Sequence, residues 1–568
     1  MILESYFQHL LIEISALSLV LFAGSACWYL FSFVNQTVKG FQPGPTVLML
    51  VGLWLISCLG MIGRLIGPLD TSLIPWLGFF LLGAFCFLVW LKQGNEWPKL
   101  FGSKDLQNLM LVCVLLIPFN TGEWSWDAGL YHISKGLHFL QTENITGVAL
   151  LNTRFGFNPL TDIWHALFLS AGVGNFAFYV LNDIILVILT LFLVEIISKS
   201  GSSTSFYVIL AFSALFMMAG GTANFADRGV ADFTAFALTS MAYICLFILV
   251  LSADDEDISV DERLRVFVAG GLIVVFACVV KVNSAPLFLF FLFWWLSQCV
   301  RKEFVKSGLV IFLVSGALGM LWLYTNLLIS GCWLYPAEFT CPLIDHAQTV
   351  SRGAAQYELD IILNHARAPI ADPPMAFLTL GQMPDWYLTW WSANKSFPYT
   401  WGIIVGASGS ALLLLIGVFQ RTPQLGRYSL LWCCLALHTL YWWTAAPALR
   451  YALFLPFMWA VLIVLLIILL SKVDLSRFQT TKPIPFILTA GLFVGVLMSD
   501  KMFSSPPKVP QATLHSYISD AGLSINVAIP DIRCWDAPLP CSSGMIFDWG
   551  RRIDYDPARG YFIHPPSL

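Results

Sequence analysis

The sequence EWSWDAGLYHISKGLHFLQ, residues 123–141, contains the pattern that decides how the rest of the chain is interpreted. If it forms a helix from Trp126, hydrophobic and polar side chains separate onto two sides. The hydrophobic side carries Trp126, Leu130, Ile133, Leu137 and Leu140, and the polar side carries Asp127, Tyr131, Ser134, Lys135, His138 and Gln141. This predicts a helix at a membrane surface whose polar side faces a cavity. The alternative is an ordinary amphipathic surface helix in which Asp127 only favours the helix N-terminus.

The composition identifies a membrane protein. Hydrophobic residues make up 58% of the chain and charged residues 11%, whereas soluble domains carry about 25% charged residues. Because a membrane-spanning helix needs about 20 apolar residues, we expect an all-α polytopic protein with about 14 transmembrane helices, roughly 13–15. The candidate spans are 9–34, 45–67, 73–91, 106–118, 174–198, 204–220, 231–251, 266–281, 284–300, 307–329, 399–420, 428–443, 449–471 and 483–500. No basic stripe is present, so we expect no nucleic-acid partner.

Lysine and arginine concentrate in alternate loops between these spans, which by the positive-inside rule are cytoplasmic. One such loop carries Lys92, Lys99 and Lys104. The segments 119–173, 330–398 and 501–568 then share the outer face. The N-terminal MILESYFQHL has no Lys or Arg before its apolar run, so it reads as a first span rather than a cleaved signal peptide. We therefore expect a bacterial inner-membrane protein with both termini on the periplasmic side.

The same pattern predicts three parts. Residues 1–105 hold spans one to three, residues 106–500 form the transmembrane core with outer loops 119–173 and 330–398, and residues 501–568 form a small periplasmic cap. Long outer segments above short cytoplasmic loops indicate a protein that acts on something at the outer surface. The phosphate-binding pattern GxxxxGK[ST] is absent from the sequence. The energy for any chemistry is therefore expected to arrive with an activated substrate.

Four of the 13 cysteines lie in the outer segments as two close pairs, Cys332/Cys341 and Cys534/Cys541. In a bacterial periplasm these pairs can form two disulfides, and the second pair flanks the compact turn 535–540. Four free thiols are the alternative. We expect both disulfides.

Several ionisable residues fall at the predicted outer ends of spans, where a charge is costly and therefore indicates function. They are Glu123, Asp127, His132 and Arg154 in the first outer loop, Asp232 at the start of the seventh span, Lys281 at the end of the eighth and Arg450 beside Tyr451 at the thirteenth. Extension of the side chain to the lipid headgroups is the alternative for Lys281 and Arg450. For Asp232, a favourable interaction with a helix N-terminus is the alternative.

Carboxylates and cations at one outer face suit the transfer of a sugar from a lipid phosphate, which is a good leaving group. Asp127 is placed to act as the general base, and Arg450 and Lys281 are placed to stabilise the departing phosphate. Attack opposite the phosphate would invert the anomeric carbon. Trp124, Trp126 and Tyr131 are candidates to flank a sugar ring.

A divalent metal (Mg or Mn) held by Glu123, Asp127 and His132 is an alternative. In an α-helix, however, His132 would lie about 140° around the axis from Asp127. No metal ligand is therefore predicted.

Four stretches resemble the GT-C superfamily of polytopic glycosyltransferases, which use polyprenyl-phosphate sugars. They are Trp126–His132, the Lys281 helix end, Ser330–Pro336 and Ala446–Tyr451. The segments SGCWLYP and CWDAPLPC also resemble uncharacterised bacterial multi-spanning membrane proteins. The GT-C resemblance implies that Asp127 is the catalytic acid-loop residue, Asp232 a second outer-loop acid and Arg450 a ligand of the lipid phosphate. Two features differ from those enzymes: three additional spans precede the acidic loop, and Asp127 has no acidic neighbour.

We therefore expect a GT-C-like, inverting glycosyltransferase. Its partners would be a polyprenyl-phosphate-linked sugar, a glycan or lipid acceptor and membrane lipid. The expected catalytic residues are Asp127 and Asp232, and the expected substrate-binding residues are Glu123, Tyr131, His132, Arg154, Lys281, Arg450 and Tyr451. The alternatives are a transporter or flippase of a lipid-linked saccharide, and a polysaccharide polymerase or ligase that would use outer-loop arginines such as Arg352 and Arg367.

Overall fold

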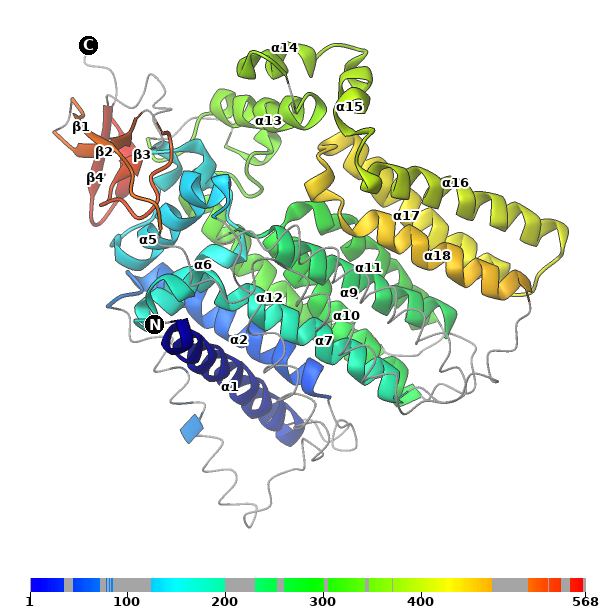
Figure 1. The fold of residues 1–568 in the computed structure, drawn as a ribbon. Coiled ribbons are helices and arrows are strands. Elements are labelled where there is room, and N and C mark those ends of the chain that lie inside the picture. The colour runs from blue at the N-terminus through cyan, green and yellow to red at the C-terminus, as the bar shows by residue number, and fades with distance from the viewer. Residues whose placement is uncertain are drawn as a thin grey trace.

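The structure is a computed structural model of the chain (Figure 1). It describes residues 2–34, 44–71, 78, 81, 83, 84, 124–199, 230–252, 260–300, 305–342, 347–369, 371–471, 509–520, 522–529, 531–542 and 552–564. In this part of the chain, seven helical segments are long and apolar enough to cross a membrane. They are α2 (Pro45–Ile66), α9 (Asp232–Leu251), α10 (Val260–Val280), η7 with α11 (Val282–Ser284 and Ala285–Val300), α12 (Val305–Ser330), α16 (Pro398–Phe419) and α18 (Phe454–Ser471). The chain is therefore a helical membrane protein.

The predicted count of about fourteen spans is not reached in the described residues. Three further predicted spans coincide with helices, namely α1 (Ile2–Val34), α7 (Val180–Lys199) and α17 (Leu425–Ala445). These helices do not combine the required length and hydropathy in their described parts. The predicted spans 106–118, 204–220 and 483–500, and nearly all of 73–91, lie outside the described residues.

Helix α9 is the central helix of the bundle. Its span is 94% buried inside the protein, against 22% for α16 at one side. A helix that is apolar all round is expected in such an interior position, and α9 packs against α7, α10, α11, α17 and α18. Its first residue, the half-buried Asp232, therefore lies at the end of the membrane helices.

Shorter helices cover one end of the bundle (Figure 1). Those before α7 are η3 (Ala128–His132), α5 (Ile133–Gln141), η4 (Val148–Leu150), η5 (Thr153–Gly156), α6 (Leu160–Ser170) and η6 (Gly174–Phe178). Those after α12 are η8 (Glu338–Thr340), α13 (Arg352–Arg367), η9 (Pro374–Ala376), α14 (Phe377–Leu380) and α15 (Trp386–Asn394), and η10 (Leu449–Tyr451) precedes α18.

The C-terminal cap contains strands, so the all-α prediction is wrong for this part. Strands β1 (Leu514–Ile518) and β2 (Ser524–Ala528) are antiparallel, and β3 (Cys541–Ser542) pairs in parallel with β2. Strands β4 (Ile553–Asp556) and β5 (Gly560–Ile563) form a separate antiparallel pair. The alternation of apolar and polar residues in this region is the period of a half-buried strand.

Main-chain hydrogen bonds join the three predicted outer segments. The Trp535 amide donates to the Gly129 carbonyl at 3.0 Å, that of Tyr561 to Thr146 at 2.8 Å and that of Ile563 to Ala347 at 2.7 Å. A Cβ atom at residue 129 would lie 2.6 Å from the Trp535 ring, so glycine is required for this contact. The segments thus form one layer, and the side of the membrane that it faces stays a prediction.

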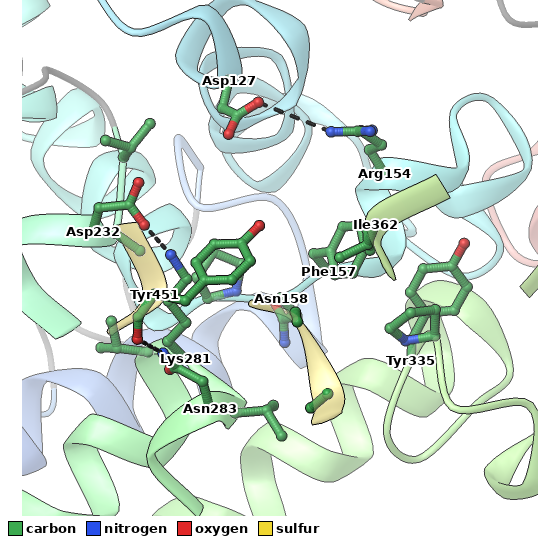
Figure 2. Close-up of a pocket in the computed structure, with 18 of the residues that line it drawn as sticks. Asp127, Arg154, Phe157, Asn158, Asp232, Lys281, Asn283, Tyr335, Ile362 and Tyr451 are labelled. Atoms are coloured by element: carbon green, nitrogen blue, oxygen red, sulfur yellow. Dashed lines mark hydrogen bonds and ion pairs between the residues drawn. The ribbon is translucent and has the colours of Figure 1, made fainter. Parts of the chain in front are cut away.

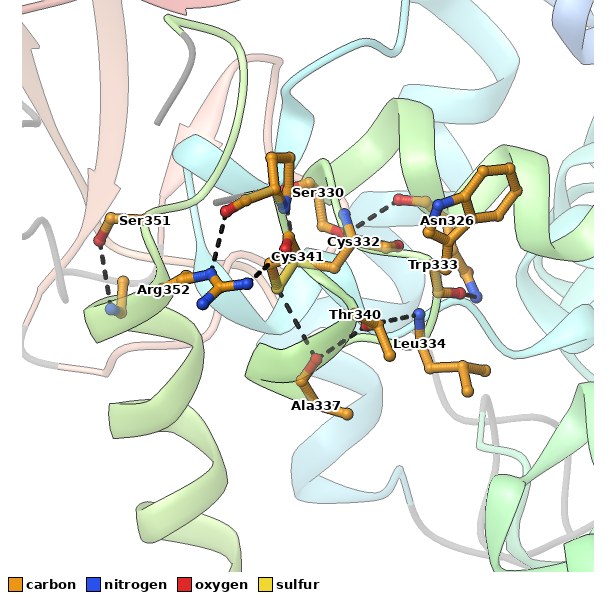
Figure 3. The surroundings of a disulfide bond; sticks show 12 residues. Asn326, Ser330, Cys332, Trp333, Leu334, Ala337, Thr340, Cys341, Ser351 and Arg352 are labelled. Atoms are coloured by element: carbon orange, nitrogen blue, oxygen red, sulfur yellow. Dashed lines mark hydrogen bonds between the residues drawn. A yellow bond between two sulfur atoms is a disulfide. The ribbon is translucent and has the colours of Figure 1, made fainter. Parts of the chain in front are cut away.

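Both expected cysteine pairs are disulfide-bonded, Cys332–Cys341 and Cys534–Cys541. Figure 3 shows the first of them beside the start of α13, where the Arg352 guanidinium donates to the carbonyls of Cys341 and Pro342, both at 3.0 Å. These contacts fix the loop after α12 and therefore the position of Tyr335 within it.

Candidate functional site

The helix that carries Asp127 contains one turn of π-helix. From Ala128 to His132 the turn is widened, and the Ile133 amide donates to the Ala128 carbonyl, five residues back instead of the four of an α-helix. Asp127 and His132, which are also five residues apart, consequently line the same cavity. The angle of about 140° predicted between them assumed an α-helix and is wrong here. Turns of π-helix occur frequently at functional sites.

The cavity has a volume of about 260 Å³ and lies where the layer of short helices meets the membrane helices (Figure 2). Of the nine residues predicted for the site, Glu123 lies outside the described residues. All the others line the cavity: Asp127, Tyr131, His132, Arg154, Asp232, Lys281, Arg450 and Tyr451. They come from sequence positions more than 300 residues apart, as the contact between Asp127 and Arg450 illustrates.

Asp127 is held between two arginines. Nη1 of Arg450 donates to its Oδ2 at 2.9 Å, and Nη1 of Arg154 lies 3.9 Å from its Oδ1. Arg154 also contacts the buried Glu358 through Nε at 3.1 Å. Burial raises the pKa of Asp127, but the positive charges of Arg450 and Arg154 outweigh burial, so the pKa lies below its ordinary value. Asp127 is therefore ionised at neutral pH.

A second ion pair, between Asp232 and Lys281, also lines the cavity (Figure 2). Asp232 opens α9 and Lys281 follows the last residue of α10, so the ends of two neighbouring membrane helices present this pair. The Lys281 ammonium lies 4.3 Å from the centre of the Tyr451 ring. Nδ2 of Asn283 donates to the Tyr451 carbonyl at 2.6 Å, which joins η7 to η10.

The charged lining favours an anionic ligand. It contains three cations, Arg154, Lys281 and Arg450, and two carboxylates, Asp127 and Asp232. The Arg450 side chain is 39% exposed, whereas that of Asp127 is 14% exposed. A molecule entering the cavity therefore meets the guanidinium group before the carboxylate.

The remaining wall is apolar. It is formed by the end of α10 and the start of η7, by one side of α13 and by the end of α17, through Val279, Val280, Val282, Leu359, Ile362, Leu363, Trp442, Ala445 and Ala446. An apolar wall with a few convergent polar groups is typical of small-molecule sites. Here the combination suits an amphiphilic anion.

Three residues on the predicted polar side of the helix that starts at Trp126 do not face the cavity. Ser134, Lys135 and His138 are fully buried in the protein interior. Lys135 contacts the Phe157 carbonyl, and Nδ1 of His138 lies 2.9 Å from Oγ1 of Thr142. Burial, with a smaller contribution from Arg64, lowers the pKa of His138 to about 3. The helix is therefore packed inside the layer of short helices and does not lie on a membrane surface as predicted.

Two of the three aromatic candidates for a sugar ring lie elsewhere. Trp124 packs on Phe178 and Trp535, with ring centres 5.9 Å and 6.4 Å away. Trp126 is 53% exposed and stacks with Arg533 at 4.2 Å. Tyr131 alone of the three lines the cavity.

Two buried carboxylates that the sequence did not indicate, Asp162 and Glu358, contact residues of the site. Oδ1 of Asp162 lies 2.7 Å from Nδ1 of His132, and Glu358 accepts a hydrogen bond from Thr153 at 2.8 Å besides contacting Arg154. Asp162 occupies the first turn of α6, where sequence indicates only a favourable helix start. Tyr335 also lines the cavity, and the motif SGCWLYP that contains it was the sequence signal by which it could have been predicted.

No group of three or more His, Cys, Asp or Glu side chains is arranged to hold a metal ion in the part of the chain that the structure describes. Asp127 and Asp232 contact cations there. The alternative of a bound Mg or Mn ion stays a prediction without a ligand set.

Residues 8–459 match the model of a family described as a domain of unknown function, DUF8201. The chain belongs to the DUF8201 family. All described cavity residues fall within the matched range, whereas the strands of the cap lie beyond it. No curated protein and no solved structure matches the chain.

Proposed function

We propose that this DUF8201 protein is an inverting membrane glycosyltransferase of the GT-C type. It transfers a sugar from a polyprenyl-phosphate donor to an envelope glycan or lipid acceptor at the periplasmic face of a bacterial inner membrane. The observation that supports this proposal is a cavity that joins two carboxylates, three cations and an apolar wall at the ends of membrane-crossing helices.

The cations provide the phosphate site. Arg450 and Arg154 can form charge-assisted hydrogen bonds to phosphate oxygens, and Lys281 adds a point charge in the same cavity. As the bond between the anomeric carbon and the phosphate oxygen breaks, negative charge grows on that oxygen. Fixed cations at this place lower the free energy of the transition state.

The size and the apolar wall agree with a lipid-linked donor. The volume of about 260 Å³ is just below the range of about 300–1,000 Å³ found for ligand pockets. Such a cavity suits the sugar and phosphate, while the polyprenyl chain would leave along the apolar wall into the bilayer. The carboxylates Asp127 and Asp232 would then lie beside the reacting carbon and the acceptor hydroxyl.

The polymerase or ligase alternative relied on Arg352 and Arg367, and neither arginine lines the cavity. Arg352 holds the disulfide loop, and Arg367 lies 5.1 Å from the centre of the Trp386 ring and donates to the Gly381 carbonyl at 3.3 Å. These contacts explain both arginines as structural residues. The glycosyltransferase is therefore the better-supported function.

Mass spectrometry of envelope glycans tests the proposal in a strain that lacks the protein. We expect one glycan to lose the mass of one sugar, and complementation with the wild-type chain to restore it. Asp127→Asn should fail to restore the sugar. Asp385→Asn is the matched control, because Asp385 is exposed and does not line the cavity. Unchanged glycan masses together with accumulation of an intact lipid-linked saccharide would favour the flippase alternative.

A further inference from the structure

His132 is a cavity residue with a partner buried behind it. Its side chain comes from the π-helical turn, is 4% exposed and places Nδ1 2.7 Å from Oδ1 of Asp162. An ionised carboxylate only accepts hydrogen bonds, so the neutral ring carries its proton on Nδ1 and a lone pair on Nε2. No hydrogen bond to Nε2 is found among the described residues, and the ring lines the cavity.

Asp162 can hold this arrangement because it stays ionised in the interior. Burial raises the pKa of its carboxyl group, but the interactions with His132, including its hydrogen bond, and with Lys135 outweigh burial and hold the pKa below the ordinary value. Nζ of Lys135 lies 3.4 Å from its second oxygen, Oδ2. A buried carboxylate behind an imidazole fixes the orientation and tautomer of the ring and stabilises the imidazolium that forms on protonation.

Asp127 is less suited to take a proton. Its two oxygens face Arg450 and Arg154, and a carboxyl group whose pKa lies below its ordinary value is a weak base. The same contacts make Asp127 well suited to hold both guanidinium groups at the phosphate.

We propose that His132 is the proton acceptor of the transfer, that Asp162 is its positioning residue, and that Asp127 orients the two arginines. This inference rests on the proposed function. The acceptor hydroxyl oxygen forms a bond to the anomeric carbon while the bond from that carbon to the phosphate oxygen breaks. The electron pair of the broken bond leaves with the polyprenyl phosphate, and the hydroxyl proton passes to Nε2 of His132.

His132→Asn tests the role, since the amide can still donate to Asp162 but has no equivalent of Nε2. Farnesyl phosphate, a short polyprenyl phosphate, serves as the binding probe for purified full-length protein in lipid nanodiscs. We expect binding within about twofold of the wild type and at least about 100-fold less glycan product in the complemented strain. Added imidazole should restore part of the product in membranes that carry His132→Ala.

His138→Asn is the matched control. His138 lies six residues further along the same helix and is buried, but it does not line the cavity. This variant should retain both binding and product. For Asp162→Asn we expect retained farnesyl phosphate binding with at least about tenfold less product, because the ring loses its orientation.

Three outcomes would overturn the inference. If His132→Asn makes as much product as the wild type while Asp127→Asn makes none, His132 is not the proton acceptor and the proposed function stands. Loss of binding together with product in His132→Asn, without rescue of His132→Ala by imidazole, assigns His132 a structural role. If the wild type does not bind farnesyl phosphate and its deletion changes no glycan, both the inference and the proposed function are wrong.

Discussion

The two ion pairs of the cavity are built in different ways. Asp232 and Lys281 belong to the ends of two neighbouring membrane helices, which pack directly against each other. Asp127, directly before η3, and Arg450, in η10, belong to the layer of short helices and are 323 residues apart in sequence. The first pair depends on the membrane bundle, whereas the second depends on how the layer of short helices is held against it. Substitutions in the two ion pairs should therefore have different effects on product and on stability.

Arg450→Ala should have the largest effect. It removes the most exposed cation of the cavity and the closest partner of Asp127. We expect product to fall by about 100- to 1,000-fold, the usual cost of a lost transition-state donor, and farnesyl phosphate binding to weaken. Arg450→Lys should recover only part of both, because an ammonium group cannot form the paired hydrogen bonds of a guanidinium. Wild-type amounts of product from Arg450→Ala would show that Arg450 does not bind the phosphate.

Lys281→Met should have a smaller effect on product, about 10- to 100-fold, because two arginines remain in the cavity. It also leaves the half-buried carboxylate of Asp232 without its partner, which should lower the thermal stability in nanodiscs. Adding Asp232→Leu should restore the stability, since removing both charges avoids an uncompensated charge. It should not restore the product. Recovery of product in the double variant would exclude both residues from the chemistry.

Gly129→Ala tests whether the contact with Trp535 positions the helix that carries Asp127 and His132. The added methyl group would clash with the Trp535 ring that packs on the π-helical turn. We expect about tenfold less product, through displacement of Asp127 and His132 by a fraction of an ångström or more. Trp535→Ala in the same chain removes the clash and should recover part of the product. Equal amounts of product from Gly129→Ala with and without Trp535→Ala would show that the contact between residue 129 and Trp535 does not position the site.

A change of pH should affect the stability of the protein through His138. Its folded-state pKa of about 3 lies below the value of about 6.5 of an unfolded chain. The unfolded state therefore binds the proton first, and stability falls as the pH drops from about 6.5 towards 3. Thermal unfolding of His138→Asn should show a weaker loss over this range. An identical pH dependence in both proteins would place His138 at the surface.

The membrane bundle could be predicted from sequence because apolar length is a local signal. The ends of α9 and α10 were placed closely enough to name Asp232 and Lys281. The layer of short helices was harder to predict, since a π-helical turn leaves no clear periodicity and was treated as an α-helix. Asp162 and Glu358 were missed because a buried carboxylate is recognised only by its tertiary partners. The strands of the cap were missed although their alternation was visible, because the composition favoured helices throughout.

The most direct test of the central claim is the release of polyprenyl phosphate in membranes of the deletion strain after addition of the purified protein. Mass spectrometry can quantify free polyprenyl phosphate and the sugar gained by the acceptor in the same sample. The proposed reaction predicts one polyprenyl phosphate per transferred sugar with the wild-type protein, and at least about 100-fold less of both products with Arg450→Ala. Movement of the intact lipid-linked sugar across the bilayer, with no polyprenyl phosphate released, would contradict it.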